Sequence, residues 1–238
     1  NGKTQNDTFL HTRQAEELAN QVPPLFEKRK IFLYQYPTVI TPAGRRKPEV
    51  TAAIENQINQ GSLVLNFTGH GNPRVWTHEQ VFVRETDFSA LANKGKYFFL
   101  VAATCNYSNV DMINDQSGGE QLMAMPNAGA ICVLSATRPV FAGDNFALNS
   151  TLYDYLFQRD AAGNQLQQRT GDIMFKTKLI HYGPGSTADN DRKFFLLGDP
   201  ALRLGLPSKF ATVDSVNNIP ATTLVQLQAL SPVSVKAS

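Results

Sequence analysis

Ser62-Leu63-Val64-Leu65-Asn66-Phe67-Thr68-Gly69-His70-Gly71 is the stretch of sequence that decides the fold. Its apolar run predicts a short buried strand, and the strand ends at a histidine between two glycines. A second run of the same kind, Tyr97–Ala103, leads into Thr104-Cys105-Asn106. In an open parallel sheet, ligands bind beyond the carboxyl ends of the strands. We therefore expect His70 and Cys105 to lie together at that edge.

These two residue types suit nucleophilic catalysis. A thiol attacks as its thiolate, and a nearby imidazole can take up the proton. Glycines on both sides of His70 permit close backbone approach and unusual dihedral angles, which a histidine needed only for packing would not require. Cys105 is followed by the polar Asn106, which indicates a sulfur that faces solvent. The sequence predicts a cysteine hydrolase with Cys105 as nucleophile and His70 as base and later proton donor.

The composition excludes several other classes of protein. The chain has 238 residues, of which 42% are hydrophobic, and this length suits one large domain or one domain with a small addition. A formal net charge of +2, with both signs spread along the chain, argues against binding to nucleic acid. The two cysteines form no pattern typical of a disulfide framework or a metal site, and Cys132 is expected to be a buried core thiol. No apolar run is long enough to span a membrane.

Strand and helix signals alternate along the chain. Helices are predicted at 12–22, 48–60, 87–93, 117–126, 146–158 and 171–182, and strands at 30–36, 62–67, 97–103, 129–136 and 194–197. The strands are apolar throughout rather than alternating, which is typical of a parallel sheet buried on both faces. The predicted fold is therefore α/β, with a mostly parallel sheet and helices on both faces.

Four motifs in this order, Phe67–Asn72, Thr104–Asn106, Gly129–Arg138 and Leu197–Pro200, resemble the gingipain family of cysteine peptidases. The family has the caspase-like α/β fold. The resemblance implies a catalytic domain over 1–206 that is incomplete at its N-terminus. It further implies that 207–238 form a linker and the beginning of an immunoglobulin-like β domain.

Within the family, further motifs are similar to those of the sortase-type peptidases of the type IX secretion system of Bacteroidetes. These are Ala103–Ser108, Gly118–Glu120, Ser135–Arg138 and Asn145–Asn149. The similarity implies a peptidase that removes C-terminal sorting domains from secreted cargo through a thioester, which water or an amine of surface lipopolysaccharide then resolves. It also implies no cofactor, contacts with other surface proteins of the secretion system, and a location at the outer-membrane surface. Two alternatives remain open: a secreted degradative protease, and a noncatalytic caspase-like scaffold in a secretion complex.

Strand-end position and resemblance together assign the remaining site residues. Backbone N–H groups of Gly71 and Cys105 are expected to form an oxyanion hole. Residues at the strand ends are expected to bind substrate, in part by main-chain pairing with an extended peptide: Trp76, Asn106, Ser135, Thr137 and Arg138. For Trp76, a position in the core is the alternative.

The resemblance does not extend to arginine specificity. The third, acidic member of gingipain active sites is expected upstream of the segment that matches Asn1–His11. The aspartate that selects arginine would fall near Asp7 or Thr8, where the match is too divergent to align. The predicted strand ends offer no acid to pair with a buried guanidinium. We therefore expect cleavage at junctions with small or polar side chains.

Overall fold

A four-stranded sheet forms the centre of the larger of the two units into which the chain divides. The computed structural model describes residues 9–42, 44–182, 188–207 and 211–238. The larger unit extends to Gln158 and continues from Gln167 to Gly205, and the smaller comprises Arg159–Leu166 and Leu206–Ser238. No helix among the described residues is both long and apolar enough to cross a membrane.

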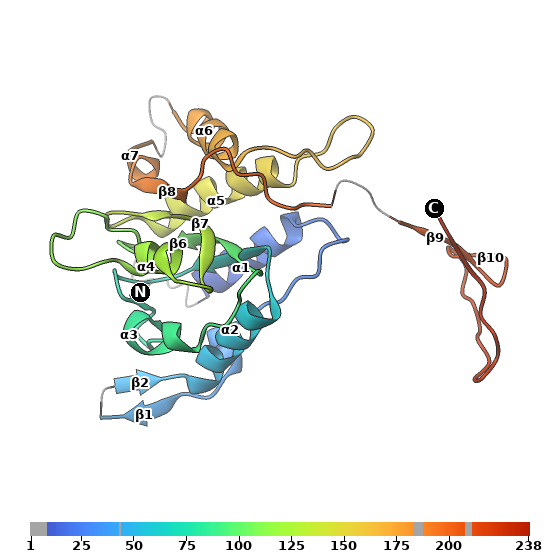
Figure 1. Ribbon diagram of the computed structural model, residues 1–238, viewed down its shortest axis with the longest axis horizontal. Helices are drawn as coiled ribbons and strands as arrows, with labels where there is room; N and C mark the ends of the chain where they lie inside the picture. Colours follow the sequence, from blue (N-terminus) through green and yellow to red (C-terminus); the bar gives the residue numbers. More distant parts are fainter. Residues whose placement is uncertain (1–8, 43, 183–187, 208–210) are drawn as a thin grey trace. The chain divides into compact units, whose positions relative to one another are not determined.

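The sheet has the order β3-β6-β7-β8 (Figure 1). Its strands are β3 (Val64–Thr68), β6 (Phe98–Ala103), β7 (Ala130–Ala136) and β8 (Phe194–Gly198). The pairs β3–β6 and β6–β7 are parallel, and β8 runs antiparallel to β7. The predicted mostly parallel sheet is confirmed.

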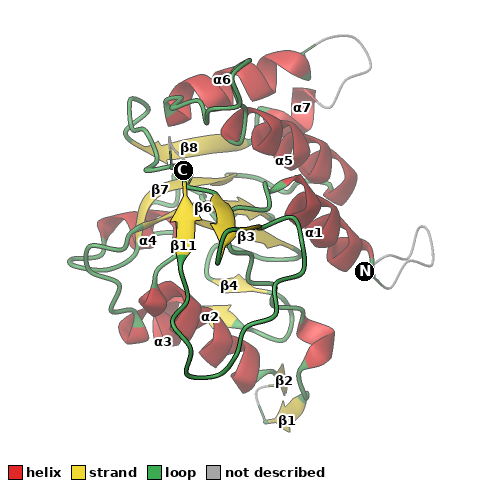
Figure 2. Cartoon of the chain, turned by 90° about the vertical axis from the view of Figure 1, so that its right-hand side faces the viewer, coloured by secondary structure: helices red, strands yellow, loops and turns green. Residues whose placement is uncertain are grey.

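Helices cover both faces of this sheet, as Figure 2 shows. One layer holds α1 (Leu10–Gln21), α5 (Ala142–Leu156) and α6 (Thr170–Ile180). The other holds α2 (Pro48–Gln60), α3 (Arg84–Asp87) and α4 (Gly118–Ala124). All six residues of β6 are buried, because alternate side chains meet the two helical layers. Phe98, Leu100 and Ala102 belong to the same core cluster as the apolar side of α2.

Shorter elements connect these layers. They are the hairpin β1 (Val39–Thr41) and β2 (Gly44–Arg46), the pair β4 (Val75–Trp76) and β5 (Phe82–Val83), the 3-10 turns η1 (Leu33–Gln35) and η2 (Phe88–Ala90), and α7 (Ala188–Asp191). The capping box predicted at Ser117 and Glu120 is present at the start of α4, which fixes where that helix begins.

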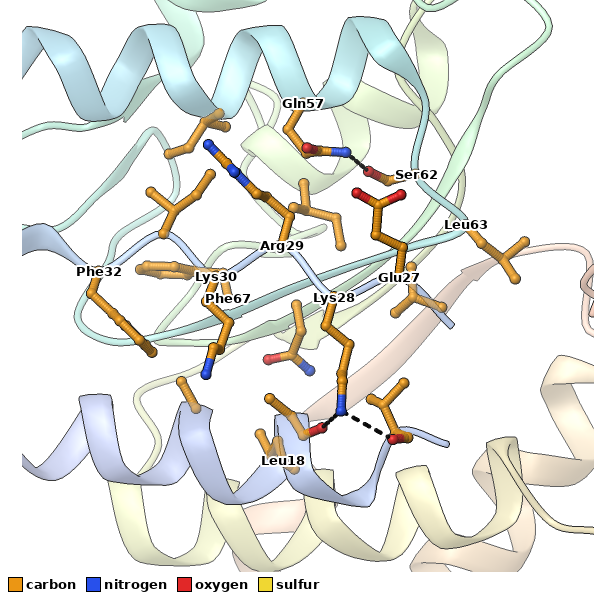
Figure 3. A pocket seen from close by; sticks show the side chains of 18 of the residues that line it. Leu18, Glu27, Lys28, Arg29, Lys30, Phe32, Gln57, Ser62, Leu63 and Phe67 are labelled. Atoms are coloured by element: carbon orange, nitrogen blue, oxygen red, sulfur yellow. Dashed lines mark hydrogen bonds between the residues drawn. The ribbon is translucent and has the colours of Figure 1, made fainter. Parts of the chain in front are cut away.

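The strand predicted at 30–36 is absent, and the η1 turn lies there instead. Phe32 is buried, so the segment uses its apolar side chains for packing without backbone pairing to β3. The Lys28 ammonium donates to the carbonyls of Ala19 (3.2 Å) and Val22 (3.5 Å) at the end of α1. A cavity of about 370 Å³ lies among this segment, α1, α2 and β3 (Figure 3). Neither His70 nor Cys105 lines it.

The smaller unit contains an antiparallel three-stranded sheet with the order β10-β9-β11. The strands are β9 (Val213–Val216), β10 (Ile219–Pro220) and β11 (Val235–Ala237). Strands are therefore present where the β segment was predicted. The immunoglobulin-like character of this segment and the domain boundary at 206 remain predictions.

Candidate active site

The register of the sheet brings the two predicted catalytic residues to one edge. Thr68, the last residue of β3, pairs with Ala103, the last residue of β6. His70 and Cys105 each follow two residues later along parallel neighbouring strands. Both loops therefore start at the carboxyl edge, side by side. The predicted juxtaposition rests on the parallel pairing of the half-buried β3 with the buried β6.

His70 begins a tight hairpin that doubles back through β4. The N–H of Thr77 donates to the His70 carbonyl at 2.8 Å, and the N–H of Asn72 donates to the Val75 carbonyl at 3.1 Å. Between these bonds Gly71 lies opposite Trp76. These two hydrogen bonds therefore fix the backbone at His70 and at Asn72, on either side of Gly71.

Gly71 permits contact between the two loops. A Cβ atom at this position would lie 2.6 Å from the Thr104 hydroxyl oxygen and 3.2 Å from the Thr104 methyl carbon. Thr104 is fully buried and immediately precedes Cys105. The requirement for glycine is thus one of close approach.

The Cys105 thiol is partly exposed and faces the segment that follows β7. The N–H of Val140 donates to the Cys105 sulfur at 3.5 Å, and the Val140 carbonyl lies 3.6 Å from the same sulfur. Asn106 adopts a left-handed conformation with φ +58° and donates its N–H to the Arg138 carbonyl at 3.4 Å. Cys132, in contrast, is fully buried as predicted, and burial raises the pKa of its thiol to about 12.

Two further histidines surround His70. Its ring centroid lies 5.4 Å from that of His11, edge to face, and 5.6 Å from that of His78. Although His70 reaches solvent, partial burial is the first cause of a lowered pKa, and the imidazoles of His11 and His78 lower it further. The Glu79 carboxylate opposes this effect. The His70 imidazole is therefore mainly neutral near pH 7, the form that can accept a proton.

Comparison with known protein families identifies the family of this chain. Residues 1–205 match the family described as "Peptidase family C25". The chain belongs to peptidase family C25. No curated protein matches it.

Several solved structures are similar to this chain in fold. The structure of the Arg-specific cysteine proteinase gingipain R (RgpB) is similar with a TM-score of 0.60 and 17% identity, covering 85% of this chain and 45% of that one. A complex of Porphyromonas gingivalis RgpB pro- and mature domains gives a TM-score of 0.57 at 17% identity, with coverage of 68% and 39%. A structure described as a protease gives 0.54 at 20% identity, with coverage of 76% and 43%. These likenesses establish the caspase-like fold, and the chain spans less than half the length of each structure.

Gly71 of the C25 domain satisfies one geometric condition for an oxyanion donor. Gly71 and Trp76 form a non-hydrogen-bonded pair of the antiparallel hairpin. The two flanking hydrogen bonds are made by His70 with Thr77 and by Asn72 with Val75, so the hairpin uses neither the N–H nor the carbonyl of Gly71. Its N–H accordingly points away from the β4 arm. The assignment of Gly71 and Cys105 as oxyanion donors remains a prediction.

Three of the five residues predicted to bind substrate have buried side chains, and main-chain pairing of the strand-end segment with a peptide stays a prediction. Trp76 is 2% exposed and stacks on Phe67 at 4.2 Å, so the core alternative holds. Ser135 is fully buried and donates its hydroxyl to the Ala102 carbonyl at 2.8 Å. The nearly buried Thr137 donates to the Lys193 carbonyl at 3.1 Å.

The other two predicted substrate-binding residues reach the surface beside Cys105. Asn106 is partly exposed, and Arg138 is exposed. The guanidinium of Arg138 pairs with the Asp111 carboxylate and also contacts the side chain of Asn109. The Arg138 carbonyl, which accepts from the Asn106 N–H, ties this group to the loop of Cys105.

Sequence reasoning missed a chain of amides behind the nucleophile. The side chain of Asn145 donates to the Ala103 carbonyl at 3.5 Å and accepts from the amide of Asn190 at 3.0 Å. The Phe141 N–H donates to the same Asn190 side chain at 2.9 Å. This chain links the end of β6 to the segment that carries Val140. Among the described residues no group of His, Cys, Asp and Glu side chains is arranged to hold a metal ion.

Proposed function

We propose that this chain is the catalytic part of a cysteine endopeptidase of the PorU type, the sortase of the type IX secretion system. The observation that carries the peptidase assignment is the placement of His70 and Cys105 at the paired ends of β3 and β6. The sortase role rests on the motif similarity described above. The proposed location is the outer-membrane surface of a Gram-negative bacterium, where other surface proteins of the secretion system would be its neighbours.

The reaction follows from the geometry. His70 takes the proton of Cys105, and the thiolate attacks the carbonyl carbon at the junction between cargo and sorting domain. Negative charge develops on the carbonyl oxygen, which the N–H groups of Gly71 and Cys105 would stabilise. The C–N bond then breaks, His70 protonates the leaving amine, and the cargo stays on Cys105 as a thioester. Water or an amine of lipopolysaccharide then gives a proton to His70, attacks the thioester carbon and releases the Cys105 thiolate.

The charges near Cys105 favour a sortase over an arginine-specific protease. A buried guanidinium needs a carboxylate partner. The carboxylate of Asp111 is paired with Arg138, which lowers its pKa through a direct hydrogen bond. A guanidinium of the substrate would therefore meet a carboxylate that Arg138 already occupies. We expect small or polar side chains at the cleaved junction.

The test uses the full-length protein and cargo that carries its sorting domain, with products identified by mass spectrometry. Cys105→Ala should abolish cleavage, and Cys132→Ala, the matched control, should retain it. Cargo found joined to lipopolysaccharide would support transpeptidation. Efficient turnover of short arginine or lysine peptides would favour the degradative protease instead. Cleavage that persists in Cys105→Ala would overturn the peptidase assignment, and the absence of any wild-type cleavage would favour the scaffold.

A further inference from the structure

A strained turn lies against the backbone of His70. It comprises Thr77–Gln80, between β4 and β5, and the Thr77 N–H donates to the His70 carbonyl at 2.8 Å. Thr77 and Gln80 have φ of +62° and +51°, in the left-handed region that costs free energy for residues other than glycine. Such strain persists where surrounding contacts impose it, and it is common at functional sites. The two residues held between these strained positions are His78 and Glu79.

Neighbouring elements hold this turn firmly. The N–H of Val81 donates to the Trp76 carbonyl at 3.1 Å and closes the turn between these two buried residues. The Thr51 hydroxyl from α2 donates to the Val81 carbonyl at 2.9 Å, and the Arg46 guanidinium from β2 donates to the Gln80 carbonyl at 3.4 Å. The position of the turn relative to His70 is therefore fixed by the fold.

The turn carries a mostly covered carboxylate on the residue next to His78, whose ring centroid lies 5.6 Å from that of His70. The Glu79 side chain is 21% exposed, and one of its carboxylate oxygens lies 3.4 Å from the Arg45 guanidinium. The charge of Glu79 raises the pKa of His70, against the lowering by burial and by the imidazoles of His11 and His78. Among the described residues, the titratable side chains that shift the pKa of His70 are thus His11 from α1 and His78 and Glu79 from the turn.

We propose that Glu79 is a positioning residue that stabilises the imidazolium form of His70. This inference rests on the proposed function, because the imidazolium forms when the Cys105 proton moves to His70. Glu79 takes no proton in that step. Its carboxylate lowers the free energy of the thiolate–imidazolium state, while His11 and His78 raise it. Arg45 limits the effect by neutralising part of the Glu79 charge.

The direct test is an NMR titration of His70 in this chain, in a Cys105→Ala background that removes coupling to the thiol. Glu79→Gln should lower the pKa of His70 by about half a unit, the size expected for one charge acting through partly hydrated surroundings. Arg45→Gln should raise it. Glu16→Gln is the matched control, because it removes the same charge from an ion pair with Lys30 on another surface, and it should leave His70 unchanged. An unchanged His70 in Glu79→Gln, or an equal fall in Glu16→Gln, overturns the inference.

A second measurement uses turnover by the full-length protein. Glu79→Gln should lower kcat more than it changes KM, and the limb of the pH profile that His70 governs should move to lower pH. Glu79→Asp should restore part of the loss, which a purely structural role would not predict. The titration needs no activity, so a shifted His70 in a protein without turnover refutes the peptidase proposal alone. Normal turnover with no effect of Glu79→Gln on the profile refutes the role of Glu79 alone.

Discussion

Replacing Gly71 by alanine tests the contact that joins the two catalytic loops. The added Cβ would lie 2.6 Å from the Thr104 hydroxyl oxygen and 3.2 Å from the Val75 carbonyl oxygen. The hairpin and the Cys105 loop must therefore separate by roughly 0.5 Å or more, as overpacking in a closely packed core requires. Misplacement of reacting groups by about 1 Å can cost about 10²-fold in rate. We expect kcat to fall about 10- to 100-fold and the free energy of unfolding to fall by about 1–3 kcal/mol.

Two companion variants isolate the steric cause. Gly143→Ala, in α5, has no atom within 4 Å of the added carbon, and it should stabilise the chain by about 0.5–1 kcal/mol. Thr104→Ala in the Gly71→Ala background removes both side-chain atoms that the new methyl group meets. The double variant should therefore recover most of the lost stability, because the two positions are directly coupled.

Urea denaturation of this chain measures stability, and cleavage of cargo by the full-length protein measures kcat. Wild-type kcat in Gly71→Ala would refute the argument that close approach of the two loops sets the active geometry. A loss that Thr104→Ala fails to reduce would refute the contact with Thr104 as its cause.

Three further predictions concern the thiols, the core and the histidines. Brief alkylation of the folded chain should label Cys105 and spare Cys132. The pKa of about 12 for Cys132 leaves roughly a thousandfold less thiolate than the ordinary value of 9.0 would. Faster labelling of Cys132, measured by peptide mass spectrometry, would contradict this. Trp76→Ala should lower the free energy of unfolding, measured by urea denaturation, by about 3–5 kcal/mol, because the ring is buried. A loss under about 1 kcal/mol would contradict the burial of Trp76. The free energy of unfolding should fall as pH drops from 7 to 5. The pKa values of His11 and His70 in the folded chain are lowered from 6.5, so the unfolded chain binds more protons in this range. The same pH dependence of stability after replacement of both histidines by glutamine would refute this explanation.

The sequence predicted the elements that carry local signals. The predicted helix over 48–60 coincides with α2, since proline occupies its first turn and Gly61, with φ +109°, ends it. The absent strand at 30–36 shows the limit of this reasoning. Apolar content indicates burial, but it does not say whether a buried segment pairs with a sheet edge. Here the preceding residue Lys28 bonds to the end of α1, and the segment packs without pairing to β3.

The sequence likewise predicted the positions of some site residues but not the directions of their side chains. The ends of the predicted strands indicated His70 and Cys105 from sequence, because parallel pairing brings the loops that follow β3 and β6 to the same edge of the sheet. The direction of a side chain beyond a strand end is not encoded in that position. Trp76 belongs to a hairpin that turns its ring back onto Phe67, and the hydroxyl of Ser135 bonds to the neighbouring strand. The short hydrophobic pattern around each residue is the same whether it faces the crevice or the core.

Position and proton affinity at this site come from different parts of the fold. The parallel pairing of β3 with β6 and the close approach of Gly71 to Thr104 determine where the two catalytic loops lie. The affinity of His70 for a proton depends on α1, through His11, and on the turn that carries His78 and Glu79. Substitutions in the turn can therefore retune the base while the sheet keeps the pair together. The pH dependence of catalysis should accordingly vary with the charges of that turn, and the identity of the nucleophile should not.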